Sequence, residues 1–179
     1  MEEHAVRADE TILGLLAVQP MHGYQLLEVF HDRQQLGSVW KLSASQLYSV
    51  LKRLERSGAI SGREEPSEIG PPRTAYTLTD VGRAQMLAWL HEPAPLPSIR
   101  RVRVECLSRL YVAQRLGLPT APIIARQRAA CQREYERLQQ AQDAPADRMD
   151  ALTGRLVQEQ LKAALAWLDH CEAVLAFHR

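Results

Sequence analysis

The sequence predicts a mainly α-helical protein in two parts: three short helices, a β-hairpin and a fourth helix come first, and an all-α region follows. Three observations lead to this fold class. Apolar residues recur at steps of three and four along most of the chain, which is typical of amphipathic helices. Two short β-prone runs flank a polar turn in the first half. Prolines at alternate positions within residues 93–97 then separate the two parts, because proline cannot continue a helix.

Composition is that of an ordinary globular protein, with 46% hydrophobic and 24% charged residues among 179. The acidic, polar N-terminus does not resemble a signal peptide, and no apolar run approaches the ~20 residues of a membrane span, so a cytoplasmic location is expected. The three cysteines stand far apart, and the histidines lack metal-ligand spacing. We therefore expect no metal and no cofactor; each cysteine is either a small buried hydrophobe or a redox-sensing thiol.

The first two helices are bounded by turn signals. The first opens at Asp9 and stops at Gln19-Pro20. Its apolar residues have helical spacing: Ile12, Leu15, Leu16 and Val18. The second runs from about His22 to Arg33, with Tyr24, Leu27 and Phe30 near one face, and Leu36-Gly37 closes it, because glycine tolerates the left-handed cap conformation.

The third helix begins with a capping box. Ser43 is a good N-cap, and Gln46 three residues later completes the reciprocal pair of hydrogen bonds. The helix ends at Ser57-Gly58. Four of its apolar residues are expected to face inward: Leu47, Val50, Leu51 and Leu54.

Two strands and a fourth helix complete the first part. The strands are Ala59–Arg63 and Arg73–Leu78, and the loop between them contains Glu68, Gly70, Pro71 and Pro72. Thr79 caps a helix that runs to Leu90. Its predicted apolar positions are Val81, Met86, Trp89 and Leu90.

The second part reads as three helices. The first of them carries Ile99, Val102, Cys106, Leu110 and Ala113 on one stripe and ends at Gly117. The second is capped by Thr120, has Pro122 in its first turn, and precedes a turn over 142–147. The last carries Leu152, Leu156, Leu161, Leu165, Leu168 and Leu175, between Asp150 and Phe177. Because these stripes leave apolar surface that a second copy would cover, the sequence predicts a homodimer, with domains at 1–92 and 98–179 and a linker at 93–97.

Two helices joined by a turn and followed by a hairpin are typical of a winged helix-turn-helix, a DNA-binding fold. The third helix would present a polar outer face made of Ser43, Ser45, Gln46, Ser49, Lys52 and Arg53. Residues 41–63 hold five basic residues and one acidic residue, Glu55. Gln46 can pair with adenine, and Lys52, Arg53 and Arg56 suit phosphates. The alternatives are a solvated helix face and a Gln46 that serves only the cap.

Several motifs resemble the PadR family of bacterial regulators, over roughly residues 10–90. In chain order they are Met21–Leu26, Trp40–Tyr48, Leu51–Glu55, Gly70–Arg73 and Tyr76–Arg83. The C-terminal region, from Arg100 onward, is similar to the long helical domain of the larger PadR subgroup. There are departures, because Ala44-Ser45 stand where members often have Pro-Gly, Ser49 where they have proline, and Thr74 where they have a basic residue.

The resemblance implies a homodimer that binds double-stranded DNA at an inverted repeat, usually as a repressor, and that in some members is released by a small aromatic compound such as a phenolic acid. It places Tyr24, Tyr48 and Arg73 on the DNA side, with the polar face of the third helix. An effector would lie near Trp89, Tyr111 or Trp167. Both tyrosines could instead pack between helices, and the tryptophans could be core residues.

Two other functions were weighed. The chain has no nucleophile elbow, zinc-protease motif or glycine-rich phosphate loop, so we do not expect an enzyme. A winged helix that binds protein instead of DNA is the second alternative, which the basic outer face of the third helix disfavours.

Overall fold

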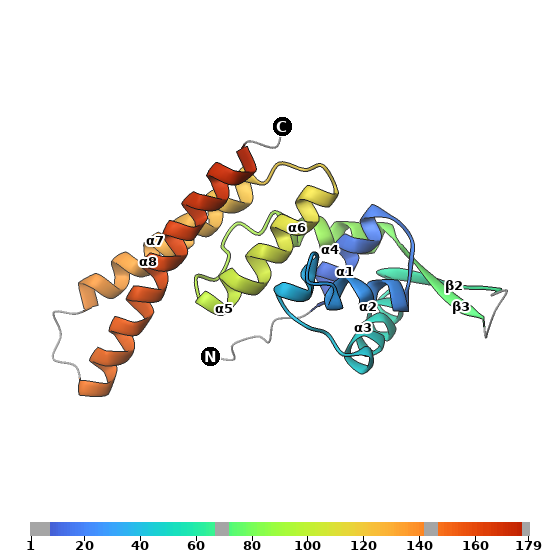
Figure 1. The fold of residues 1–179 in the computed structure, drawn as a ribbon, viewed down its shortest axis with the longest axis horizontal. Coiled ribbons are helices and arrows are strands. Elements are labelled where there is room, and N and C mark those ends of the chain that lie inside the picture. Colours follow the sequence, from blue (N-terminus) through green and yellow to red (C-terminus); the bar gives the residue numbers. More distant parts are fainter. Residues whose placement is uncertain (1–7, 67–71, 142–146, 177–179) are drawn as a thin grey trace. The chain divides into compact units, whose positions relative to one another are not determined.

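The computed structural model describes residues 8–66, 72–141 and 147–176. The predicted loop residues Glu68, Gly70 and Pro71, most of the predicted turn at 142–147, and Phe177 lie outside this range. The described chain is mainly helical with one small sheet (Figure 1), which confirms the predicted fold class.

The elements follow one another as α1 Asp9–Val18, β1 Met21–His22, α2 Gly23–His31, η1 Leu36–Ser38, α3 Ala44–Arg56, β2 Ile60–Glu65, β3 Arg73–Leu78, α4 Asp80–Leu90, α5 Ile99–Arg101, η2 Val102–Cys106, α6 Leu107–Arg115, α7 Ala121–Ala141 and α8 Arg148–Ala176. Helix α1 ends before Pro20, and α3 ends before Gly58, whose φ of 72° is a conformation that glycine adopts readily. Both ends are where the sequence predicts them.

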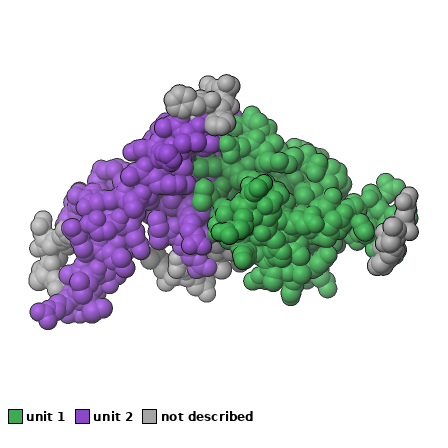
Figure 2. Space-filling model, viewed as in Figure 1, with its two compact units in different colours: residues 1–91, 107–118 green, residues 92–106, 119–179 purple. Residues whose placement is uncertain are grey.

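The chain divides into two compact units, which Figure 2 shows in different colours. Unit 1 comprises Met1–His91 with Leu107–Leu118, and unit 2 comprises Glu92–Cys106 with Pro119–Arg179. The predicted domains were residues 1–92 and 98–179. The observed units differ from them mainly in helix α6, which belongs to unit 1 and not to unit 2. Helix α6 packs on α1 and α4 of unit 1, where Val112 fills the space beside Gly14. A Cβ on Gly14 would lie 2.6 Å from both Val112 methyl carbons, so the contact requires glycine.

The core of unit 1 contains most of the predicted apolar positions, but one predicted position in α2 and one in α4 are exposed. In α2 the buried residues are Leu26, Val29 and Phe30, whereas Tyr24 is 43% exposed. In α4, Val81 is 51% exposed. Tyr24 and Val81 both lie in the first turn of their helix. A residue there has helical neighbours on one side only, so the three- and four-residue spacing of apolar residues defines its face poorly.

Gly37 has a different role from the predicted helix cap. It does not adopt positive φ, and α2 has already ended at His31. Gly37 lies in the 3₁₀ turn η1, where its amide donates to the Asp32 carbonyl at 3.0 Å. A Cβ there would stand 2.7 Å from that same carbonyl oxygen, so the tight turn excludes a side chain.

The sheet has the order β1–β3–β2 with antiparallel pairing throughout. Strands β2 and β3 form the predicted hairpin, with Ile60 opposite Leu78 and Glu65 opposite Arg73. In Figure 1 this hairpin extends away from the helices of unit 1 as a wing. The sequence gives no sign of β1, whose Met21 pairs with Tyr76 and whose His22 pairs with Ala75. Two residues are too few to show alternation.

The stripe predicted as one helix from Ile99 to Ala113 is interrupted. A short helix α5 leads into a π-helical segment η2, and α6 follows. Ile99 is 39% exposed, and Val104 is buried instead. A π-turn adds one residue to a helical turn and therefore shifts the buried face out of simple 3.6-residue phase.

Unit 2 contains the long pair α7 and α8, together with the segment that precedes them. The nearly fully buried amide of Gln127 donates to the Leu96 carbonyl at 3.0 Å, which holds the proline-rich segment against α7. That segment is therefore packed structure and not an open spacer. On α8 the predicted stripe divides: Leu161 and Leu168 are buried, while Leu152 and Leu156 are 63% and 58% exposed.

Candidate nucleic-acid interface

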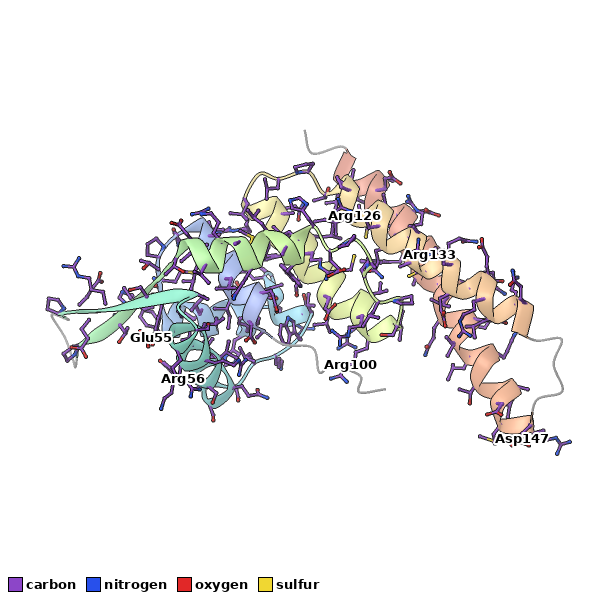
Figure 3. The ribbon with its side chains drawn as sticks, turned by 180° about the vertical axis from the view of Figure 1, so that it is seen from behind. Glu55, Arg56, Arg100, Arg126, Arg133 and Asp147 are labelled. Carbon is purple, nitrogen blue, oxygen red and sulfur yellow. The ribbon has the colours of Figure 1, made fainter. Side chains whose placement is uncertain are left out.

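Helix α3 has one apolar and one polar face, as the sequence predicts. Leu47, Val50, Leu51 and Leu54 are all at most 7% exposed. The residues between them are exposed, namely Ser45, Gln46, Tyr48, Ser49, Lys52, Arg53, Glu55 and Arg56. The side chains of Glu55 and Arg56, labelled in Figure 3, mark the end of this helix. A short, exposed, polar helix surface with serines near its start is what close approach to a DNA groove requires.

The start of α3 is fixed by the predicted capping box. The Gln46 backbone N–H donates to Ser43 Oγ at 3.2 Å, and Gln46 Oε1 accepts from the Ser43 backbone N–H at 3.0 Å. Ser43 Oγ also lies 3.0 Å from Gln46 Oε1. The Gln46 side chain is thus folded back over the first turn, and its carboxamide oxygen is already used by the cap.

This geometry bears on base recognition by Gln46. Pairing with adenine through both ends of the carboxamide would require Oε1 to leave the cap. We expect Gln46→Ala to lower the free energy of unfolding by about 1 kcal/mol, the typical value of an N-terminal cap, and to leave the preferred operator sequence unchanged. Selection of bound DNA from a random library, run with both proteins, checks this. A changed preference at one base position would show that Gln46 gives up the cap to read that base.

An aromatic cluster joins the start of α2 to the wing. The ring of Tyr24 stacks on His22 with centroids 5.7 Å apart, and the Arg73 guanidinium carbon lies 5.2 Å from the Tyr24 ring centroid. Arg73 Nη1 also donates to Tyr24 Oη at 3.4 Å. His22 Nε2 is 3.6 Å from Glu65 Oε2 on β2. These contacts bring Tyr24 and Arg73 together, as the predicted interface needs, and hold the base of the wing against α2.

Tyr48 lies on the outer face of α3 and is 52% exposed. Its ring edge and hydroxyl rest on Gly23: a Cβ on that glycine would be 2.9 Å from Tyr48 Cε1 and Oη. Tyr48 therefore packs between α2 and α3 along one edge and leaves about half of its surface exposed. Gly23 provides the space that lets α2 and α3 approach at this point.

Arg53 forms an ion pair with Asp9 that no sequence pattern predicts. Its Nε and Nη2 donate to Asp9 Oδ1 and Oδ2 at 2.8 and 2.6 Å, a two-pronged ion pair between α3 and the first turn of α1. The hydrogen bond to Asp9 raises the pKa of Arg53. The 44 residues that separate the partners explain why no local pattern reveals the pair.

Lys52 and Arg53 are accordingly expected to differ in salt dependence. We expect Lys52→Ala to flatten the dependence of log affinity on log salt by about 0.9, the value for one released counterion at B-DNA, and Arg53→Ala to leave that slope unchanged because its charge is neutralised by Asp9. Binding titrations of both variants on one DNA duplex between low and moderate salt give the slopes. Equal flattening by the two substitutions would show that Arg53 leaves Asp9 for a phosphate.

The predicted effector residues fall in different surroundings. Trp89 lies under the Arg109 guanidinium, 5.4 Å from ring centroid to carbon. Tyr111 lines a cavity in unit 1 and donates to Gln35 Oε1 at 3.0 Å. Trp167 is a half-buried residue of α8 in unit 2.

The described residues contain neither a metal-binding cluster nor a membrane-spanning helix. No cluster of three or more histidine, cysteine or acidic side chains could hold a metal ion there. Among the same residues, no helix has the length and apolar character that a membrane span requires.

Part of the first unit is similar to known proteins. Residues 12–88 match the model of the transcriptional regulator PadR-like family. The negative transcriptional regulator PadR of Bacillus subtilis is 32% identical over 105 residues, which are 55% of this chain and 57% of that protein. The chain's match thus spans little more than half of that curated relative.

Solved structures of related chains were compared as well. The crystal structure of Bacillus subtilis PadR in complex with operator DNA is 25% identical and covers 93% of this chain and 97% of that one, with a TM-score of 0.47. The structure of the same protein with p-coumaric acid is 24% identical and covers 94% and 95%, with a TM-score of 0.43. Over residues 12–88, the chain is similar to the transcriptional regulator PadR-like family.

Proposed function

We propose that this protein is a sequence-specific DNA-binding regulator, a repressor that binds an inverted-repeat operator as a homodimer. The observation that carries the proposal is the surface of α3: four leucine and valine side chains anchor the helix, and serines, Tyr48 and Lys52 form its exposed side. It acts by binding and not by catalysis, and its partner, chromosomal DNA, places it in the cytoplasm.

The base-reading side of α3 would be Ser45, Ser49 and Tyr48, which are exposed and lie along one surface of the helix. Lys52 would contact a phosphate, and Ser43 supplies a hydroxyl at the helix start. The wing adds Arg73, which is exposed and held in place by Tyr24. Arg53 and Gln46 were both predicted to contact DNA. They are proposed instead to support this surface, Arg53 through its ion pair with Asp9 and Gln46 through the capping box with Ser43.

Dimerisation is proposed to use α8. Met149, Leu152 and Leu156 recur on one side of that helix and are 64%, 63% and 58% exposed. Exposed apolar side chains at helical spacing indicate a surface that another molecule covers. A second copy related by a twofold axis pairs the same patch with itself, and two recognition helices one DNA turn apart, about 34 Å, match an inverted repeat.

Release by a small aromatic effector is part of the proposal because the Bacillus subtilis relative has a structure with p-coumaric acid. Of the three residues predicted to contact an effector, Tyr111 is the one that lines a cavity.

Selection of bound DNA from a random library tests the function and yields the operator. The expected result is an enriched inverted repeat with half-sites one helical turn apart. A retardation assay on that duplex, with Lys52→Ala and Arg73→Ala beside the parent, then tests the interface. Failure to enrich any sequence, with a protein that is folded by circular dichroism, would favour a winged helix that binds protein.

A further inference from the structure

The second half of α3 carries the basic side chains Lys52, Arg53 and Arg56. All of them are exposed, but their surroundings differ. Lys52 and Arg56 form no ion pair within the part of the chain that the structure describes, whereas Arg53 is bound by Asp9. The outer face of α3 therefore has one uncompensated cation fewer than its sequence suggests.

The Asp9–Arg53 pair uses both carboxylate oxygens and two guanidinium nitrogens. Nε donates to Oδ1 at 2.8 Å, and Nη2 donates to Oδ2 at 2.6 Å. Two parallel charge-assisted hydrogen bonds form one of the stronger geometries of an arginine–carboxylate pair. The Asp9 side chain is 14% exposed and that of Arg53 is 44% exposed. The acid is thus mostly buried, while the guanidinium that it binds lies at the surface.

The position of Asp9 is fixed by the packing of unit 1. It is the first residue of α1, where a negatively charged side chain interacts favourably with the helix dipole. Buried side chains such as Ile12 and Leu16 anchor α1 in the core, and α1 contacts α3 directly. Asp9 is therefore held beside Arg53 by the fold and not by a chance approach of two mobile surface groups.

This pairing changes what Arg53 can contribute to DNA binding. A cation that neutralises a phosphate releases condensed counterions, and the affinity that it adds falls as salt rises. The Asp9–Arg53 pair has no net charge to contribute in this way. For Arg53 to act with its full charge it would have to leave Asp9, and a mostly buried carboxylate without its partner is costly.

We infer that Asp9 sets the strength of DNA binding without taking part in sequence recognition. By pairing with Arg53 it removes one cation from the surface that would contact phosphates, and so lowers the affinity for every DNA sequence by a similar factor. Because phosphate contacts carry no sequence information, the preferred operator does not depend on Asp9. The inference rests on the proposed function, and it gives a role to a residue outside both α3 and the wing.

A purely structural role for the pair makes the opposite prediction. If Asp9 served only to hold α3 against α1, its loss would loosen α3 and weaken DNA binding. If Asp9 withholds a cation, its loss strengthens DNA binding and makes that binding more dependent on salt. The sign of the change therefore separates the two roles.

Binding titrations of full-length Asp9→Asn and the parent, on the selected operator and on a scrambled duplex, test the inference. Asparagine keeps the shape of the side chain and one acceptor oxygen but removes the charge. For each bound subunit we expect about eightfold tighter binding to both duplexes at about 0.1 M salt, and a slope of log affinity against log salt that is steeper by about 0.9. Asp9→Ser removes the same charge with a residue that suits a helix start, and should give the same two changes.

Two further variants show where the gain comes from. Asp80→Asn is the matched control, because Asp80 is an exposed acid in the first turn of α4 and has no ion pair with any described residue. It makes the same change in net charge without releasing an arginine, and should leave the slope unchanged. The double variant Asp9→Asn with Arg53→Gln has the net charge of the parent and should return to the parent's slope.

The outcomes separate the role of Asp9 from the proposed function. Unchanged or weaker binding by Asp9→Asn and Asp9→Ser, in proteins whose circular dichroism and thermal unfolding match the parent, would overturn the inference and leave the function intact. A gain in affinity that persists in the double variant would also overturn it, because the gain would not come through Arg53. If neither the parent nor any variant binds DNA at low salt, the proposed function fails, and the role of Asp9 fails with it.

Discussion

Gly82→Ala will lower the free energy of unfolding of unit 1 by about 3 kcal/mol, the upper part of the usual range for forcing an extra carbon into a packed site. A Cβ at this position would lie 2.1 Å from the Ala59 carbonyl oxygen and 2.7 Å from Leu78 Cδ1. To relieve this steric overlap, α4 would have to move away from the base of the wing. That movement would also break the cap in which the Gly82 amide donates to Thr79 Oγ1 at 3.2 Å.

Urea denaturation in a Trp167→Phe background measures this, because the two remaining tryptophans, Trp40 and Trp89, both belong to unit 1. Gly154→Ala on α8 is the matched control. A Cβ there meets nothing within 4 Å, so the same substitution should stabilise its helix by up to about 1 kcal/mol. Equal stability of Gly82→Ala and the parent would show that the wing and α4 are not rigidly packed.

The double substitution Leu152→Glu and Leu156→Glu will convert the proposed dimer to a monomer and weaken binding to the proposed operator at least a hundredfold. Both leucines are more than half exposed on α8. Their replacement introduces two like charges into a patch that faces its own copy. A monomer engages one half-site only and loses the avidity of two linked sites, which is commonly worth 10²–10⁴ in affinity.

Sedimentation velocity and retardation assays on one operator duplex report the two effects. Ala151→Glu is the control, because residue 151 is exposed but adjacent helical positions point in different directions. Unit 2 should keep its helicity in both proteins, since the buried side of α8 at Leu161 and Leu168 is untouched. If the double variant stays dimeric, the subunits meet through another surface.

Local signals in the sequence were sufficient for much of unit 1. The partners of the Ser43–Gln46 capping box are three positions apart, and the apolar face of α3 repeats within four turns. Both can therefore be predicted from the sequence without knowledge of the fold. The β2–β3 hairpin could be predicted for the same reason, because its signals are also local. Strand β1 was not, because its two residues become a strand only by pairing with β3.

The candidate site was less predictable where it depends on distant partners. The exposed polar face of α3 agrees with the prediction, whereas the contact between Tyr24 and Arg73 was not predicted. Asp9 could not be found, because its pairing with Arg53 exists only once α1 and α3 have packed. The cavity is likewise a tertiary object, since Tyr111 comes from a helix that the sequence assigns to the other part of the chain.

The placement of α6 also constrains how the protein is made. A nascent chain that has left the ribosome only as far as His91 lacks Leu107–Leu118, and Gly14 on α1 then has no Val112 beside it. Unit 1 therefore completes its core only after the first part of unit 2, residues 92–106, has also been synthesised. A gene truncated at the proline-rich segment would encode α3 and the wing without the helix that closes the core beneath them.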